Sequence, residues 1–67
     1  MKITLNNRPE SFDKEKISIS ELLKIKNYSF KMLVIKVNSK LVKKDAYDIF
    51  EIKEGDDVTV LHLVSGG

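Results

Sequence analysis

The sequence predicts an α+β domain of two layers, in which one main helix packs on one face of a mixed sheet of four or five strands. Three observations support this fold class: strand-type alternation at both ends of the chain, one amphipathic stretch with a marked helix start, and a length of 67 residues, enough for a single core. We expect residues 1–64 to form this domain and residues 65–67 to form a flexible tail.

The first element is predicted to be a β-hairpin. Apolar residues occupy the odd positions of residues 1–5, which is the period of a half-buried strand. Residues 6–8 offer a turn, because the two asparagines tolerate positive φ. Pro9 can begin a second strand at a sheet edge, where its missing N–H does no harm, and Phe12 is the inward residue of that strand. Residues 13–16 are polar and predict a bend.

A short helix should follow. Ser18 and Glu21 have the spacing of a capping box, and Ile17 and Leu22 have the spacing of a hydrophobic staple. Apolar residues at helical spacing then predict two to three turns, with Asn27 as the C-terminal stop.

The second half of the chain is predicted to return to strands. An apolar run broken only by Lys36 indicates a largely buried strand, and Asn38-Ser39 predicts a turn after it. The expected segments are a strand at 32–37, a short return strand at 40–42, a helical turn and loop on the core edge at 43–53, a turn at 54–57 and a final strand at 58–64.

Composition excludes several kinds of site. Cysteine is absent, which rules out a disulfide framework, a cysteine-ligated metal and a thiolate nucleophile. His62 is the only histidine, so we expect no metal site and interpret it as an outward strand residue.

The charge pattern and the hydropathy pattern bear on partners and location. The net charge is +2, and a loose group of lysines lacks the aromatic residues typical of nucleic-acid binding, so we interpret it as a solvated face. The group consists of Lys36, Lys40, Lys43 and Lys44. The chain opens with alternation and not with a signal peptide, and no apolar run reaches membrane-spanning length. We expect a cytoplasmic protein, monomeric when free, with no nucleic-acid or membrane partner.

The tail Ser65-Gly66-Gly67 is the candidate functional site. Two glycines do not help folding, but a tail without Cβ atoms can thread a narrow channel in another protein. The C-terminal carboxylate of Gly67 is ionised at neutral pH, so acyl chemistry requires activation, for example by adenylation. The chain has no phosphate-binding loop, so a separate enzyme would use the ATP, and we expect no bound cofactor. The alternative is a frayed terminus without a role.

Several short motifs follow one another along the chain in a definite order. They are Ile35-Lys36-Val37-Asn38, Leu41-Val42, Tyr47, Gly55-Asp56, Val58, Val60 and Gly66-Gly67. In these motifs the sequence resembles a known family, the sulfur carriers of thiamine biosynthesis (ThiS). The family pattern is V-x-V-N-G, a hydrophobic pair, a basic segment with an aromatic, G-D-x-V and a closing G-G, and the capping segment 18–23 resembles its helix start. Ser39, Lys43 and Tyr47 depart from the usual glycine, proline and tryptophan.

The resemblance implies a ubiquitin-like β-grasp fold, with the final strand central beside the first. It also implies that a ThiF-like adenylyltransferase activates Gly67, that a cysteine desulfurase or another donor supplies sulfur, and that the resulting thiocarboxylate serves thiazole synthase. The chain would then be a protein co-substrate and not an enzyme.

The final strand is also the candidate docking surface. Val58, Val60 and Val64 alternate with Leu61 and Leu63, so both faces of this strand are apolar, while a single helix covers only one of them. We therefore take Val58, Val60, Leu61 and Leu63 as docking candidates. The alternative is that segment 43–53 folds over the second face.

Three other functions remain open on sequence alone. The first is the small subunit of molybdopterin synthase, which shares the fold and the thiocarboxylate. The second is a protein modifier whose Gly67 acyl group ends on a lysine amine. The third is a binding module whose tail does nothing.

Overall fold

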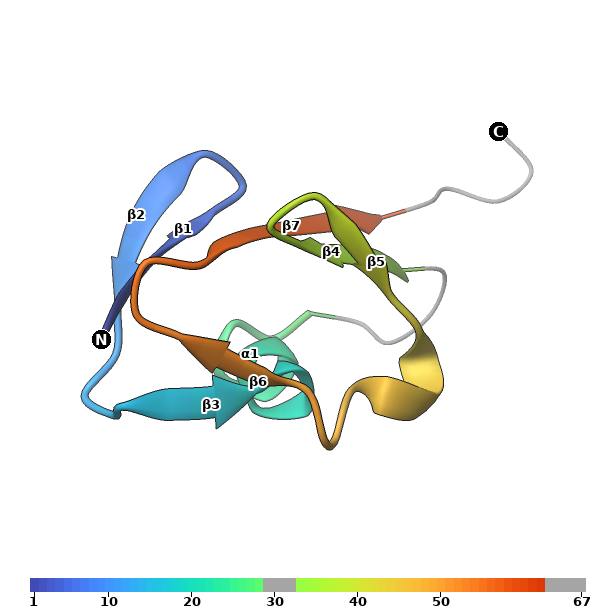
Figure 1. Ribbon diagram of the computed structural model, residues 1–67, viewed down its shortest axis with the longest axis horizontal. Coiled ribbons are helices and arrows are strands. Elements are labelled where there is room, and N and C mark those ends of the chain that lie inside the picture. Colours follow the sequence, from blue (N-terminus) through green and yellow to red (C-terminus); the bar gives the residue numbers. More distant parts are fainter. Residues whose placement is uncertain (29–32, 63–67) are drawn as a thin grey trace.

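A five-stranded sheet forms one layer of the protein, and the helix α1 packs against one face of it (Figure 1). The structure is a computed structural model that describes residues 1–28 and 33–62. The elements are β1 (Lys2–Leu5), β2 (Arg8–Ser11), β3 (Lys16–Ser18), α1 (Ile19–Ile25), β4 (Leu33–Val37), β5 (Lys40–Val42), the 3₁₀ helix η1 (Lys44–Ala46), β6 (Glu51–Lys53) and β7 (Asp57–His62).

The last strand occupies the centre of the sheet, whose order is β2-β1-β7-β4-β5. β7 is parallel to β1 and antiparallel to β4, while the two hairpins β1–β2 and β4–β5 are antiparallel. This arrangement confirms the predicted mixed sheet and the predicted position of the final strand beside the first.

Both hairpins turn through two-residue loops with positive φ. The first loop is Asn6-Asn7, with φ of 50° and 65°, and the second is Asn38-Ser39, with φ of 51° and 71°. Two positive φ values in succession define the hairpin turn whose twist matches that of the strands. Asparagine tolerates this conformation and serine much less, which explains why glycine is usual at position 39 in the family pattern.

The helix begins and ends as the sequence predicts. The Ser18 side chain accepts from the Glu21 N–H at 3.1 Å, and the Glu21 side chain accepts from the Ser18 N–H at 3.2 Å. At the other end Asn27 has a φ of 58°, and Tyr28 donates to the carbonyl of Leu23 at 2.9 Å, which closes a Schellman motif. Both caps rest on short-range hydrogen bonds, which is why the sequence reveals them.

A second, two-stranded sheet was not predicted. β3 pairs antiparallel with β6, where the sequence suggested a polar bend and a loop (Figure 1). Ile17 and Ile52 lie opposite each other in this pair, and both are fully buried. The interpretation of 43–53 as a helical turn and a loop on the core edge is thus correct for η1 and wrong for β6.

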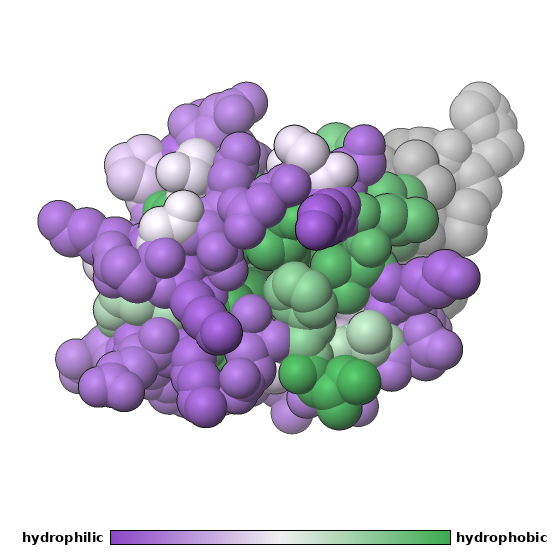
Figure 2. Space-filling model, in the orientation of Figure 1, coloured by the Kyte–Doolittle hydropathy of each residue, from purple (hydrophilic) through white to green (hydrophobic). Residues whose placement is uncertain are grey.

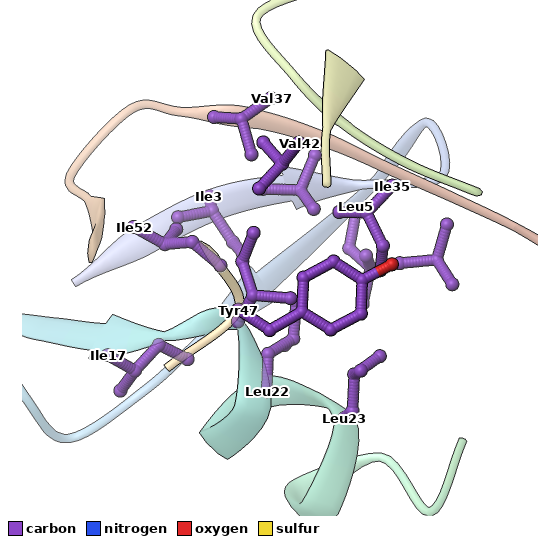
Figure 3. Close-up of a cluster of buried hydrophobic side chains, with 13 residues drawn as sticks. Ile3, Leu5, Ile17, Leu22, Leu23, Ile35, Val37, Val42, Tyr47 and Ile52 are labelled. Atoms are coloured by element: carbon purple, nitrogen blue, oxygen red, sulfur yellow. The ribbon is translucent and has the colours of Figure 1, made fainter. Parts of the chain in front are cut away.

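The core lies between α1 and the five-stranded sheet, and the β3–β6 pair closes one side of it. The Tyr47 ring lies between Leu22 and Leu23 of α1 and the sheet residues Leu5 and Ile35 (Figure 3). Burial raises the pKa of the Tyr47 hydroxyl above its usual value of 10.0, because the anion would lose its hydration. Tyr47 therefore performs the packing role of the aromatic residue expected in the basic segment.

Two kinds of feature are absent from the part of the chain that the structure describes. Over residues 1–28 and 33–62, no helix is long and apolar enough to cross a membrane. The same part of the chain contains no group of three histidine, aspartate or glutamate side chains placed to hold a metal ion.

Candidate functional site at the end of the last strand

The structure describes the strand from which the candidate tail extends. β7 is described to His62, whereas Leu63, Val64 and the predicted site residues Ser65, Gly66 and Gly67 lie outside the described residues. The base of the tail, meaning β7, is therefore the part of the site whose geometry is described. The hydrogen bonds of β7 show how firmly the fold holds it.

β7 is held along its whole length on one side. It pairs with β4 at five successive positions, from Val58 opposite Val37 to His62 opposite Leu33. On its other side it pairs with β1 at only two positions, Asp57 opposite Thr4 and Val58 opposite Leu5. Beyond Val58, the chain of β1 turns away into the first hairpin loop.

Where β1 no longer pairs with β7, the Asn6 side chain takes over one of its hydrogen bonds. The Asn6 N–H donates to the Val58 carbonyl at 2.9 Å, and the Asn6 side-chain oxygen accepts from the Val60 N–H at 2.8 Å. A partly buried N–H of the central strand thereby keeps a partner, which avoids the cost of an unpaired donor. The sequence indicated Asn6 only as a turn residue, because its partner lies 54 positions away.

The start of β7 is fixed by a second asparagine. The Asn38 side chain accepts from the Asp57 N–H at 2.9 Å and donates to the Asp56 carboxylate at 3.1 Å. The same Asp56 carboxylate accepts from the Lys53 N–H at 2.9 Å. Asp56 therefore lies in a turn, as predicted for residues 54–57, and its hydrogen bonds connect the β4–β5 turn to the β6–β7 turn.

The two faces of β7 differ in burial, which corrects part of the docking prediction. Val58 and Val60 are 0% and 7% exposed and belong to the core under α1, so neither forms a docking surface in this fold. Leu61 points to the opposite face and is 47% exposed. Leu63 lies outside the described residues.

Segment 43–53 does not cover the Leu61 face in this structure. Tyr47 and Ile52 enter the same core as Val58, and the Tyr47 carbonyl accepts from the Ser20 N–H of α1 at 3.0 Å. The Ser20 hydroxyl also donates to the Asp48 carboxylate. The segment therefore packs on the helix side of the sheet.

Three apolar side chains share the outer face, meaning the face of the sheet opposite α1. Leu61 lies directly opposite the half-buried Val34 in the β4–β7 pair. Leu41, 61% exposed, is the diagonal neighbour of Val34 across β4–β5, next to Lys36. We call Val34, Leu41 and Leu61 the outer patch. Neither Val34 nor Leu41 was among the predicted docking residues, although the alternation of β4 places Val34 on the face opposite the buried Ile35.

Comparison with known proteins now adds to this geometry. The ThiS family model matches residues 3–67, which is nearly the whole chain. No curated protein matches the chain significantly.

Two solved structures of a thiamine biosynthesis protein (ThiS) from Geobacter metallireducens have the same fold. The crystal structure is 28% identical with a TM-score of 0.89 and full coverage of both chains. The solution NMR structure is also 28% identical, with a TM-score of 0.81, and it covers all of this chain and 88% of the other. The chain therefore belongs to the ThiS family, the ubiquitin-like sulfur carriers of thiamine biosynthesis.

Proposed function

We propose that the C-terminal carboxyl group of Gly67 is the group that carries sulfur. The observation that supports this most is the family match, which extends through Gly66-Gly67. In the sequence these two glycines come shortly after β7, the central strand of the sheet. A rigid base followed by two terminal glycines, which have no side chains, positions the carboxyl group while leaving the end of the chain narrow enough for another protein's active site.

The chemistry follows from the carboxylate. With a pKa of about 3.5 it is an anion at neutral pH and a poor electrophile. Attack of the Gly67 carboxylate on the α-phosphate of ATP gives an acyl adenylate and pyrophosphate. Hydrogen sulfide then displaces AMP and gives the thiocarboxylate directly, so that sulfur replaces the oxygen that left with AMP. A persulfide, the form in which a cysteine desulfurase provides sulfur, instead gives an acyl disulfide, and a thiol must cleave its S–S bond, forming a disulfide with the donor cysteine, to release the thiocarboxylate.

In this scheme the chain is a co-substrate and its partners supply the catalysis. A ThiF-like adenylyltransferase binds the ATP, a cysteine desulfurase or another donor provides the sulfur, and thiazole synthase receives it. The family assignment favours thiazole as the destination over molybdopterin. We also propose a cytoplasmic location, where ATP is available for the activation step.

The test of the carboxyl site combines a deletion with a tail substitution. Intact mass of the protein from its natural source should correspond to a chain that ends at Gly67. Removing Gly67 should abolish pyrophosphate release by the adenylating enzyme, and Gly66→Val should reduce it strongly, because a side chain obstructs the channel. Ser65→Ala is the control and should remain active. Full activity without Gly67 would instead support a binding module.

We further propose that the outer patch docks the adenylating enzyme. Exposed apolar side chains gathered beside the base of the tail are typical of a partner surface. Leu61→Asp should raise the KM of the enzyme for this carrier about tenfold with little change in kcat, because it puts a charge into an apolar contact. The matched control is Ile25→Asp, since Ile25 is 49% exposed on α1 and Leu61 47% exposed on β7. Equal effects of the two substitutions would contradict docking at the outer patch.

The proteins that bind the carrier, or that become attached to it, distinguish the alternative functions. Co-purification with a large molybdopterin synthase subunit in place of thiazole synthase would assign the sulfur to molybdopterin. Branched Gly-Gly peptides on target lysines in cell lysates would identify a protein modifier.

A further inference from the structure

The two edges of the five-stranded sheet are built differently. In a hairpin with a two-residue loop, the pair next to the loop exchanges both hydrogen bonds and the following pair exchanges none. In β1–β2 the closing pair is Leu5 and Arg8, so Pro9, opposite Thr4, faces outward. Proline has no N–H, and the β2 edge therefore offers no donor at this position. This edge is protected against pairing with another strand.

The β5 edge has no such protection. Its closing pair is Val37 and Lys40, so Leu41, opposite Lys36, directs both its N–H and its C=O away from β4. β5 is the last strand of the sheet, and its middle residue, Leu41, is 61% exposed. Among the described backbone hydrogen bonds outside helices and strands, none involves Leu41. The edge therefore presents a donor and an acceptor to an incoming strand.

Apolar surface lies next to this open edge. A groove of about 440 Å³ runs between β5 and β6, and Val42 and Phe50 are among the side chains that line it. Ile49, 77% exposed, lies just before Phe50 in the same segment. Figure 2 shows hydrophobic surface over β5 and the segment that follows it, while the surface around β2 and β3 is hydrophilic. Side chains of an added strand would find apolar contacts here.

The charge around the edge is positive. Segment 33–47 contains four lysines and a single acidic residue, Asp45. The two acidic side chains that line the groove already have partners: Glu51 pairs with Lys16 at 3.1 Å, and the Asp56 carboxylate accepts from the Asn38 side chain and the Lys53 N–H. The four lysines, Lys36, Lys40, Lys43 and Lys44, are all exposed, and no salt bridge of the described residues includes any of them.

This charge selects between two possible occupants. A second copy of the chain, paired β5 to β5, would bring two sets of lysines together, and like charges across strands are destabilising. A strand with acidic side chains would meet complementary charge instead.

We propose that the β5 edge binds an extended, acidic segment of a partner protein by strand addition, with Leu41 donating and accepting the central main-chain hydrogen bonds. Valine-like side chains of the segment fill the groove beside Val42 and Phe50, and its acidic side chains contact Lys40, Lys43 and Lys44. The edge shares Leu41 with the outer patch but does not involve Gly67, so strand addition and the Gly67 chemistry can each fail without the other.

The test is an NMR titration of the full chain with two synthetic probes. One peptide alternates glutamate and valine, and its matched partner alternates lysine and valine. The acidic peptide should shift the amides of residues 40–42 and slow hydrogen exchange of the Leu41 N–H, whereas the basic peptide should do neither. Equal binding of both peptides, or no shift at β5 with either, would refute the proposal.

Two variants sharpen the result. Leu41→Pro reproduces at β5 what Pro9 provides at β2, and it spares the β4–β5 ladder because the Leu41 N–H points outward. It should weaken binding of the acidic peptide about fivefold to tenfold. The double variant Lys40→Glu, Lys43→Glu leaves the backbone unchanged, and it should lower affinity for the acidic peptide and raise it for the basic one. The strand-addition model is wrong if Leu41→Pro, folded as judged by native amide dispersion, binds the acidic peptide as tightly as the unmodified chain does. It is also wrong if the double lysine variant keeps the affinities of the unmodified chain for both peptides.

Discussion

At the scale of single residues, a few backbone positions with positive φ shape the fold. They are Asn6, Asn7, Asn27, Asn38, Ser39 and Gly55. Asparagine and glycine adopt this conformation at low cost, so the asparagines in the sequence predicted both hairpin turns and the end of the helix. Ser39 is the exception, because serine adopts a positive φ less readily than asparagine or glycine.

A pair of substitutions tests this account of the turns. Ser39→Gly should stabilise the protein by about 0.5 to 1 kcal/mol, since glycine occupies φ of 71° without strain. Gly55→Ala should destabilise it by about 1 to 2 kcal/mol through the backbone alone, because a Cβ at Gly55 would meet no heavy atom within 4 Å. Urea unfolding measures both changes. Two shifts in the same direction would contradict the conformational explanation.

The helix cap carries a prediction about pH. The Ser18 backbone N–H and then the Lys14 ammonium, 3.1 Å away, hold the pKa of Glu21 below its usual value of 4.5. A carboxyl whose pKa is lower in the folded state adds stability above its unfolded pKa and loses it as pH falls through the folded pKa. The urea midpoint should therefore decline below about pH 4.5 by more in the unmodified protein than in Glu21→Gln, which keeps the capping-box geometry but does not titrate. Identical pH profiles would contradict this role of Glu21.

At the scale of elements, the sequence predicted the features that depend on residues close together along the chain and missed those that depend on residues far apart along it. The hairpins, the capping box and the Asn27 stop depend on residues within a few positions of one another. β3 and β6 contain three residues each, and their pairing joins Ile17 to Ile52 across half the chain. Strands of this length have no measurable period, so their pairing is visible only in the folded structure.

A substitution in this second sheet measures its importance. Ile52→Val should cost about 0.5 to 1.5 kcal/mol, because it removes a methylene from a fully buried site. Ile49→Val makes the same chemical change three residues earlier, where the side chain is 77% exposed, and should cost much less. Denaturant unfolding compares the two midpoints. Equal losses would show that β6 contributes little to the core.

At the scale of the whole molecule, the sequence identified the strand that leads to the site but not the face it exposes. The predicted strand 58–64 has apolar residues on both faces, and the choice between them depends on where α1 packs. The structure resolves this choice by burying Val58 and Val60 and leaving Leu61 exposed. The Asn6 contact with Val60 escaped the sequence for a similar reason, because it joins the two ends of the chain.

A domain of this size leaves most of the chemistry to its partners. It presents a central strand that is hydrogen-bonded to two asparagine side chains, Asn38 at Asp57 and Asn6 at Val60, and an exposed apolar patch beside that strand. Our proposal adds that the tail enters another protein's active site. The central claim is that the tail carboxyl group becomes the sulfur-bearing group.

Intact-mass and tandem mass spectrometry test this claim most directly, on protein incubated with ATP, the cognate adenylating enzyme and a sulfur donor. We predict a mass increase equal to the replacement of one oxygen atom by sulfur, located in the peptide that contains Gly67 and absent when ATP is omitted. An unchanged mass with a competent enzyme, or sulfur found on any other peptide, would contradict the account.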